Sequence, residues 1–144
     1  MRGIVITLFG AFLVFASCAE KKSVESADEN TTTAVAEKTV TKDIEPEEFK
    51  ELMANENVIV LDVRSAEEVA VGKIEGSVNV DFYSETFKEE VAKLDQSKEV
   101  LIYCAGGVRS KKAMNIMTTL NFPKLYNLLG GYGKWSSLGY PTVK

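Results

Sequence analysis

Cys104 is the side chain of this sequence best suited to nucleophilic chemistry. It follows the apolar run Val100–Tyr103 and opens a loop with two adjacent glycines. The loop residues after the cysteine are Ala105, Gly106, Gly107, Val108, Arg109 and Ser110. Paired glycines let the backbone curl through positive φ angles. A curled loop that enters a helix turns its N–H groups inward as an anion nest. A cysteine in such a nest has a lowered pKa and reacts as a thiolate.

Basic residues beside the loop support this interpretation. Arg109, Lys111 and Lys112 gather where we expect a helix to begin, near Ser110. Cations at a helix N-terminus oppose the helix dipole and destabilise the helix by up to about 1 kcal/mol each. Residues that are unfavourable for local structure often serve a function, so this cluster suggests a binding or catalytic site. The alternative for Lys111 and Lys112 is that they are solvated surface lysines with no role in a site, which only make the protein more soluble. The alternative for Cys104 is a small buried apolar side chain.

The composition leaves few other chemistries open. The 144 residues include no histidine and two cysteines, Cys18 and Cys104. This composition excludes Ser-His-Asp and Cys-His catalysis, His-ligated metal sites, Cys-based zinc sites and a disulfide framework. We therefore expect neither a metal nor a cofactor. The formal net charge of -4 argues against a nucleic-acid partner, because such binders carry a basic surplus.

The N-terminal residues predict export. Ile4–Ala16 is an apolar run that is shorter than the ~20 residues of a membrane-spanning helix and fits a signal peptide. The segment ending Ala16-Ser17-Cys18 resembles a bacterial lipobox, apart from Phe15, where a smaller aliphatic residue is usual. We predict a signal peptide over residues 1–17 and a lipid on Cys18. That lipid would hold the chain on a membrane of the bacterial cell envelope, facing the periplasm or in the outer membrane. An ordinary secretory signal is the alternative.

Two further segments complete the predicted organisation. Residues 18–38 are rich in Glu, Lys, Ser, Thr and Ala and hold no aromatic, Gly or Pro. Such a segment cannot bury enough apolar surface to fold, so we expect a flexible tether. Residues 39–144 are predicted to form one domain.

Apolar runs and helical patterns alternate along this domain. Strands are predicted around Val40, at 58–61, around Val78 and Val80, at 100–103 and at 125–129. Helices are predicted from Pro46, from Ser65 to near Gly72, after a cap at Ser84, over a stripe of Ala113, Ile116, Met117 and Leu120, and around Trp135. This alternation predicts an α/β fold, an open parallel five-stranded sheet with helices on both faces. Tyr132 and Trp135 are expected in the core.

Four segments, in this order, resemble a single-domain rhodanese, a sulfurtransferase, over about residues 44–143. They are Leu61–Glu68, Gly72–Val80, Tyr103–Ser110 and the closing segment Leu128–Val143. The second segment carries Lys73 and Glu75 where the family usually has His and Pro, and Lys134 replaces a usual acidic residue. The replaced His and Pro are mostly structural in the family, so the fold is expected to survive. Ala105 and Gly106 stand where the family often has larger or polar residues, which puts substrate preference in doubt.

The resemblance implies a persulfide on Cys104. Thiosulfate or a persulfide would donate sulfur, and cyanide or an external thiol, including a thiol on a partner protein, would accept it. Arg109 would orient an anionic donor or stabilise the leaving sulfite, and the amides of residues 105–110 would stabilise the charge. Asp62 and Arg64 are expected to fix the loop by hydrogen bonds, with a purely structural ion pair as the alternative.

Two other functions stay open at this point. The domain could be a persulfide carrier or sensor with negligible turnover. A phosphatase of the same fold is the less favoured of the two. Such phosphatases have five residues between the cysteine and the arginine, whereas only four residues separate Cys104 from Arg109 here, and the sixth position after Cys104 is Ser110.

Overall fold

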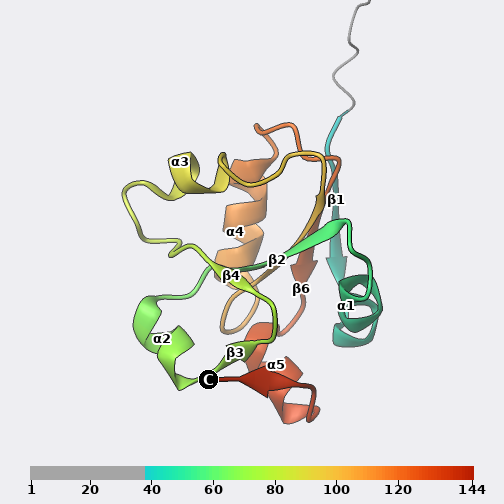
Figure 1. Ribbon diagram of the computed structural model, residues 1–144, viewed down its shortest axis with the longest axis vertical. Coiled ribbons are helices and arrows are strands. Elements are labelled where there is room, and N and C mark those ends of the chain that lie inside the picture. The colour runs from blue at the N-terminus through green and yellow to red at the C-terminus, as the bar shows by residue number, and fades with distance from the viewer. Residues whose placement is uncertain (1–37) are drawn as a thin grey trace, which may run out of the picture. The chain divides into compact units, whose positions relative to one another are not determined.

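The continuous apolar runs of the sequence form the strands of a parallel sheet. The computed structural model describes residues 38–144, and its main sheet has the strand order β1-β6-β5-β2-β4 (Figure 1). The strands are β1 (Val40–Ile44), β2 (Val58–Asp62), β4 (Val78–Asn79), β5 (Glu99–Tyr103) and β6 (Lys124–Leu128). All neighbouring pairs are parallel. The predicted open five-stranded parallel sheet is therefore confirmed.

Helices cover both faces of this sheet, as predicted (Figure 1). They are α1 (Pro46–Met53), α2 (Ala66–Val71), α3 (Phe87–Val91), α4 (Val108–Met117) and α5 (Gly131–Ser137). Successive strand residues point to opposite faces, so Leu61 and Ile102 join the core under α3 and α4. Val60 and Leu101 join the core under α1 and α5. Each such buried apolar side chain stabilises the fold by about 2 kcal/mol.

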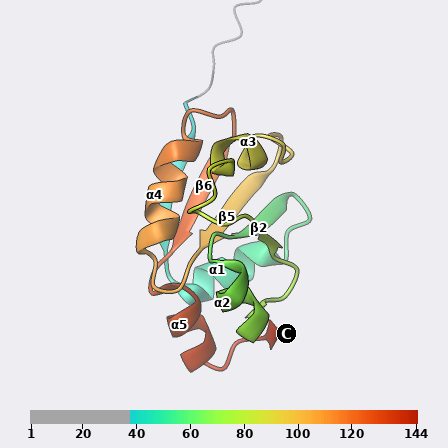
Figure 2. The same cartoon turned by 90° about the vertical axis from the view of Figure 1, so that its left-hand side faces the viewer.

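Helix α2 is attached differently from the other four. It contains no buried residue, and it lies with α5 at the end of the domain toward which β1 points (Figures 1 and 2). The predicted pairing at its start is present, because the Ser65 N–H donates to the Glu68 carboxylate at 3.1 Å. Apolar packing therefore contributes little to holding α2, and polar contacts dominate its attachment.

Three details of the predicted elements are wrong. The short strands β3 (Lys73–Ile74) and β7 (Thr142–Val143) form a separate antiparallel pair, which is too short to leave a periodic pattern. Ser84 is not a helix cap, since α3 starts at Phe87 with Thr86 before it. Ile116 is 36% exposed, because the buried stripe of α4 runs through Ser110, Ala113, Met114 and Met117.

The core position of Trp135 is confirmed. Its ring is 1% exposed and packs edge-on against Phe49 with centroids 5.7 Å apart, while its indole N–H donates to the Pro141 carbonyl at 3.0 Å. Tyr132 is partly buried and packs against the same core. Both residues anchor α5 on the face of the sheet that α1 also covers.

The predictions for the N-terminal part concern residues that the structure does not describe. The signal peptide over 1–17, the lipid on Cys18 and nearly all of the tether over 18–38 fall outside the described residues. Within residues 38–144, no helix is long and apolar enough to cross a membrane.

Candidate active site

Cys104 lies directly after β5, at the carboxyl edge of the parallel sheet. Its side chain is 1% exposed and joins the core beneath α3 and α4. The next two residues, Ala105 and Gly106, are exposed. The sulfur therefore sits at the base of the loop, with the loop backbone between it and solvent.

The Cys104 sulfur accepts hydrogen bonds from the loop that surrounds it. The Gly107 N–H donates to Sγ at 3.1 Å, and the Ser110 hydroxyl donates at 3.4 Å. Burial by itself raises the pKa of the thiol, but the Ser110 hydroxyl and the amides of Ser110, Gly106 and Gly107 outweigh burial, so the pKa is lowered. Hydrogen bonds to the charged form favour ionisation. The loop is thus built to stabilise a thiolate.

Gly107 is required by the geometry of this loop. Its φ of +96° is in the left-handed region, and it caps the N-terminus of α4. A Cβ there would lie 3.1 Å from the Leu128 carbonyl oxygen and 3.3 Å from the Gly130 amide nitrogen. Both the backbone angle and the space therefore call for glycine.

Helix α5 holds the loop from the other side of its backbone. The N–H groups of Tyr132 and Gly133, which lie at the start of α5, donate to the carbonyls of Cys104 and Ala105 at 2.8 and 3.0 Å. A Cβ on Gly131 would come within 2.3 Å of the Cys104 carbonyl oxygen. The sequence analysis did not assign these residues to the site, although the Gly130-Gly131 pair was a visible signal of close backbone approach.

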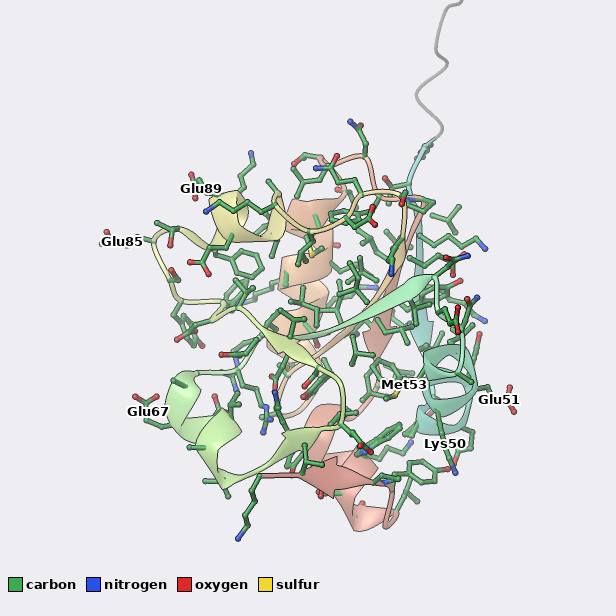
Figure 3. All side chains as sticks on the ribbon, in the orientation of Figure 1. Lys50, Glu51, Met53, Glu67, Glu85 and Glu89 are labelled. Carbon is green, nitrogen blue, oxygen red and sulfur yellow. The ribbon has the colours of Figure 1, made fainter. Side chains whose placement is uncertain are left out.

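Arg109 meets a carboxylate where an anionic donor was expected. Its guanidinium makes a two-pronged ion pair with Glu68, with Nη1–Oε2 at 2.7 Å and Nη2–Oε1 at 2.6 Å. Arg109 lowers the pKa of Glu68 to about 2, and Glu68 in turn raises the pKa of Arg109. The neighbouring Glu67 points away from the domain (Figure 3). Glu68 therefore connects α2 to the start of α4.

Asp62 and Arg64 form a buried ion pair beside the loop. The Arg64 Nη2 donates to Asp62 Oδ2 at 2.6 Å and to the Gly72 carbonyl at 2.8 Å, and its Nη1 donates to the Glu68 carbonyl at 3.4 Å. Neither side chain bonds to residues 104–110, which corrects the expectation that the pair fixes the loop directly. The pair instead braces α2, because Arg64 bonds to the Glu68 carbonyl within that helix and to the Gly72 carbonyl just after its end.

A groove opens between α2, the reactive loop and α5. Its volume is about 310 Å³, and Arg64, Glu68, Val71, Ala105 and Tyr132 are among its lining residues. The Tyr132 ring lies 4.1 Å from the Arg64 guanidinium carbon. This groove reaches the exposed start of the loop at Ala105, the residue after Cys104.

The remaining predicted residues lie around the loop as follows. Ser110 is fully buried and faces the sulfur, whereas Val108 is 68% exposed. Lys111 is paired with Asp43 at 2.6 Å, and Lys112 is exposed. Residues 38–144 hold no group of three or more His, Cys, Asp or Glu side chains placed to bind a metal. That the loop residues act on a substrate stays a prediction.

Fold and site together define an α/β domain with a loop at the carboxyl edge of its sheet whose Gly107 N–H and Ser110 hydroxyl donate to a buried cysteine. A family model described as a rhodanese-like domain matches residues 45–138. The chain belongs to this family, which is a family of sulfur-transfer domains, and the resemblance noted in the sequence is confirmed.

Solved structures support the same family. A rhodanese-related protein from Thermoplasma volcanium superposes with a TM-score of 0.63 at 28% identity, covering 71% of this chain and 97% of that one. A rhodanese-like domain protein from Staphylococcus aureus gives a TM-score of 0.58 at 28% identity, covering 65% and 90%.

Curated relatives share the domain within longer chains. A tRNA uridine(34) hydroxylase from Cytophaga hutchinsonii is 38% identical over 97 residues, covering 65% of this chain and 31% of the relative. A protein of the same name from Rickettsia typhi is 31% identical over 94 residues, covering 61% and 37%. The chain thus spans about a third of the length of these relatives.

Proposed function

We propose that this chain is a sulfurtransferase that carries sulfane sulfur as a persulfide on Cys104. The observation that carries the proposal is the environment of Sγ, which receives the Gly107 N–H and the Ser110 hydroxyl at the N-terminus of α4. These contacts lower the pKa of the thiol, and a thiolate is the nucleophile that sulfur transfer requires.

The first half-reaction loads the cysteine. The Cys104 thiolate attacks the outer sulfur of thiosulfate, an S–S bond forms to Cys104, and the S–S bond of thiosulfate breaks. Sulfite leaves with the bonding electron pair. The terminal sulfur of the new persulfide carries negative charge, which the loop amides stabilise as a preorganised electrostatic clamp.

The second half-reaction unloads it. Cyanide or an external thiolate attacks the terminal sulfur of the persulfide, and the sulfur–sulfur bond to Cys104 breaks. The products are thiocyanate or a new persulfide, together with the original Cys104 thiolate. No second cysteine occurs in residues 39–144, so we expect the acceptor to be external, and a protein thiol qualifies. Two separate half-reactions give ping-pong kinetics.

Arg109 acts on the donor in this proposal only when Glu68 releases it. Both of its terminal nitrogens are bonded to Glu68. The N–H groups of the loop are therefore the first hydrogen-bond donors that an anionic substrate meets. A persulfide donor makes smaller demands on Arg109 than thiosulfate, because it brings less charge to the groove. Both donors remain part of the proposal.

We do not extend the tRNA chemistry in the relatives' name to this chain. The match covers about a third of those proteins, and a net charge of -4 disfavours a polyanionic substrate.

Mass spectrometry after incubation with thiosulfate tests the proposal. We expect a gain of one sulfur atom on the peptide that contains Cys104, followed by release of thiocyanate when cyanide is added. A Cys104→Ser variant is the matched control and gains nothing. A mass gain with negligible thiocyanate release identifies a persulfide carrier instead, and no mass gain on the wild-type chain contradicts both functions.

We also propose that Cys18 is lipidated and places the domain at the cell envelope. The support is the sequence ending in Ala16-Ser17-Cys18 after an apolar run. Metabolic labelling with a fatty acid in a bacterial host is expected to label the wild-type chain and the Cys104→Ser variant, but not Cys18→Ser. Equal labelling of wild type and Cys18→Ser, or none in either, contradicts the anchor.

A further inference from the structure

The groove at Ala105 presents a carboxylate beside the reactive loop. Two charged side chains, Arg64 and Glu68, are among its lining residues. Arg64 is 3% exposed, and its guanidinium donates to both oxygens of Asp62, so its charge is compensated within the core. Glu68 is therefore the charged residue of this groove that a substrate can contact.

The cation that compensates Glu68 is turned away from the groove. Arg109 donates to both oxygens of Glu68, but it is not among the residues that line the groove. The Glu68 side chain is 34% exposed, whereas that of Arg109 is 19% exposed. The negative partner of this ion pair thus faces the groove and is the more accessible of the two.

Three hydrogen bonds fix the Glu68 carboxylate in this position. In addition to the two from Arg109, the Ser65 N–H donates to Oε2 at 3.1 Å. A two-pronged ion pair fixes the geometry of its partners as well as their charge. The carboxylate is therefore held at the groove and is not free to turn into solvent.

Arg109 links this ion pair electrostatically to Cys104. Glu68 chiefly, and the Cys104 thiolate to a smaller extent, raise the pKa of Arg109. The net charge around the sulfur therefore depends on whether Arg109 is compensated, and Glu68 compensates it. A donor with two negative charges gains little from a neutral ion pair and is repelled by the carboxylate that lines the groove.

Two sulfur donors of similar size differ in their charge. Thiosulfate is a dianion at neutral pH, and methanethiosulfonate, in which a methyl group replaces one oxygen, is a monoanion. With either donor, the Cys104 thiolate attacks the outer sulfur, a new S–S bond forms and the S–S bond of the donor breaks. Sulfite or methanesulfinate leaves with the bonding electron pair. Differences in the intrinsic reactivity of the donors cancel when a variant is compared with wild type.

We propose that Glu68 is a specificity-determining residue, which shifts the preference of Cys104 away from thiosulfate and toward sulfur donors that carry a single negative charge. Thiosulfonates and the persulfides of uncharged thiols belong to this class. The inference rests on the proposed sulfur transfer and names the donor class of the same site.

The rate of Cys104 loading in the full-length chain, measured by quenching and mass spectrometry, tests this role. Glu68→Gln keeps the shape of the side chain and removes its charge. We expect the second-order rate constant to rise about tenfold with thiosulfate and about threefold with methanethiosulfonate, because the Coulomb energy is proportional to the charge of the donor. High salt should reduce both increases, since it screens charges near the surface.

Glu67→Gln is the matched control, because it removes the same charge from the neighbouring residue of α2. Glu67 is exposed and points away from the domain (Figure 3), so both donors should load this variant as they load wild type. The ratio of the two rate constants does not depend on how much of a variant is folded. A folding defect therefore cannot imitate the expected change of preference.

The possible results separate this inference from the proposed function. Loading of wild type by both donors, with equal increases for both donors in Glu68→Gln, overturns the inference alone. Equal effects of Glu67→Gln and Glu68→Gln, or increases that persist in high salt, do the same. No loading of wild type by either donor contradicts the proposed function together with the inference.

Discussion

Two buried acidic groups with different partners, the Asp62 carboxyl and the Cys104 thiol, lie side by side at the carboxyl ends of the strands. Asp62 ends β2 and Cys104 follows β5, and Asp62 is directly paired in register with Tyr103. The two are equally buried, at 0% and 1% exposure. Asp62 contacts the Arg64 guanidinium through both of its oxygens, whereas Cys104 receives only N–H and O–H donors.

The difference shows how one sheet edge can hold both an inert and a reactive anion. A buried charge that is fully paired with an opposite charge is compensated and serves the structure. A buried thiolate that is stabilised by N–H and O–H donors, with no direct ion pair to a cation, keeps its charge and its nucleophilicity. We therefore propose Cys104 as the reactive group of the two, with the Asp62–Arg64 ion pair as a structural brace.

Cys104→Ser is expected to have the largest effect, because it removes the proposed nucleophile. A hydroxyl does not accept sulfane sulfur, so transfer is expected to fall by about a thousandfold or more. The serine hydroxyl is smaller and stays bonded to the same donors, so the urea midpoint should shift little. Steady-state thiocyanate formation and urea unfolding measure the two effects. Substantial residual transfer would mean that another group carries the sulfur.

Arg64→Ala tests the brace in the same way. It leaves the Asp62 carboxylate buried without a countercharge, which is expected to lower the free energy of unfolding by about 3–5 kcal/mol. Chemical denaturation measures this loss. Arg109→Ala, which breaks the more exposed pair with Glu68, is the matched control and is expected to lose about 1 kcal/mol or less. Equal losses would remove the distinction between the two ion pairs.

Ser110→Ala reduces the stabilisation of the thiolate without removing the nucleophile. Because the Ser110 hydroxyl is the largest of the contributions that lower the Cys104 pKa, its loss should raise that pKa, since a hydrogen bond to the charged form favours ionisation. The pH dependence of alkylation of Cys104 by iodoacetamide reports this shift. Ser136→Ala, on the exposed surface of α5, serves as the control, and an unchanged profile in Ser110→Ala would contradict the role of the hydroxyl.

Glu68→Gln has the smallest expected effect and concerns pH. The pKa of Glu68 is about 2 in the folded chain, below the ordinary value of about 4.3. A lowered pKa stabilises the fold above the ordinary value, and this contribution disappears as the pH falls toward 2. Wild type should therefore lose more unfolding free energy than Glu68→Gln between neutral and acidic pH. Parallel curves for the two proteins would show that the ion pair contributes nothing.

Much of the fold could be predicted because its signals are local. Runs such as Val58–Leu61 and Val100–Tyr103 are long enough to identify buried strands, and the alternation with helices fixes a parallel sheet. Lys73–Ile74 and Thr142–Val143 escaped prediction because two residues leave no period, and their partners lie far along the chain. Thr86 takes the place predicted for Ser84 because neighbouring residues of similar capping ability are hard to rank.

The candidate site shows the same difference between local and long-range signals. The loop of residues 104–110 could be located because its glycines and helix start are contiguous. The partner of Arg109 could not, because Glu68 lies 41 residues away, and the contacts of Asp62 and Arg64 depend on where α2 ends. Sequence spacing therefore located the candidate nucleophile but left the partners of the nearby charged side chains open.

The titration of Cys104 itself decides whether the loop creates a thiolate. The ultraviolet absorbance of the thiolate can be followed against pH in the Cys18→Ser chain, with Cys18→Ser/Cys104→Ser as the reference. The amides and the Ser110 hydroxyl predict a midpoint below the ordinary cysteine value of about 8.5. A midpoint at or above that value would mean that burial outweighs the hydrogen bonds, and the proposed sulfur transfer would lose its nucleophile.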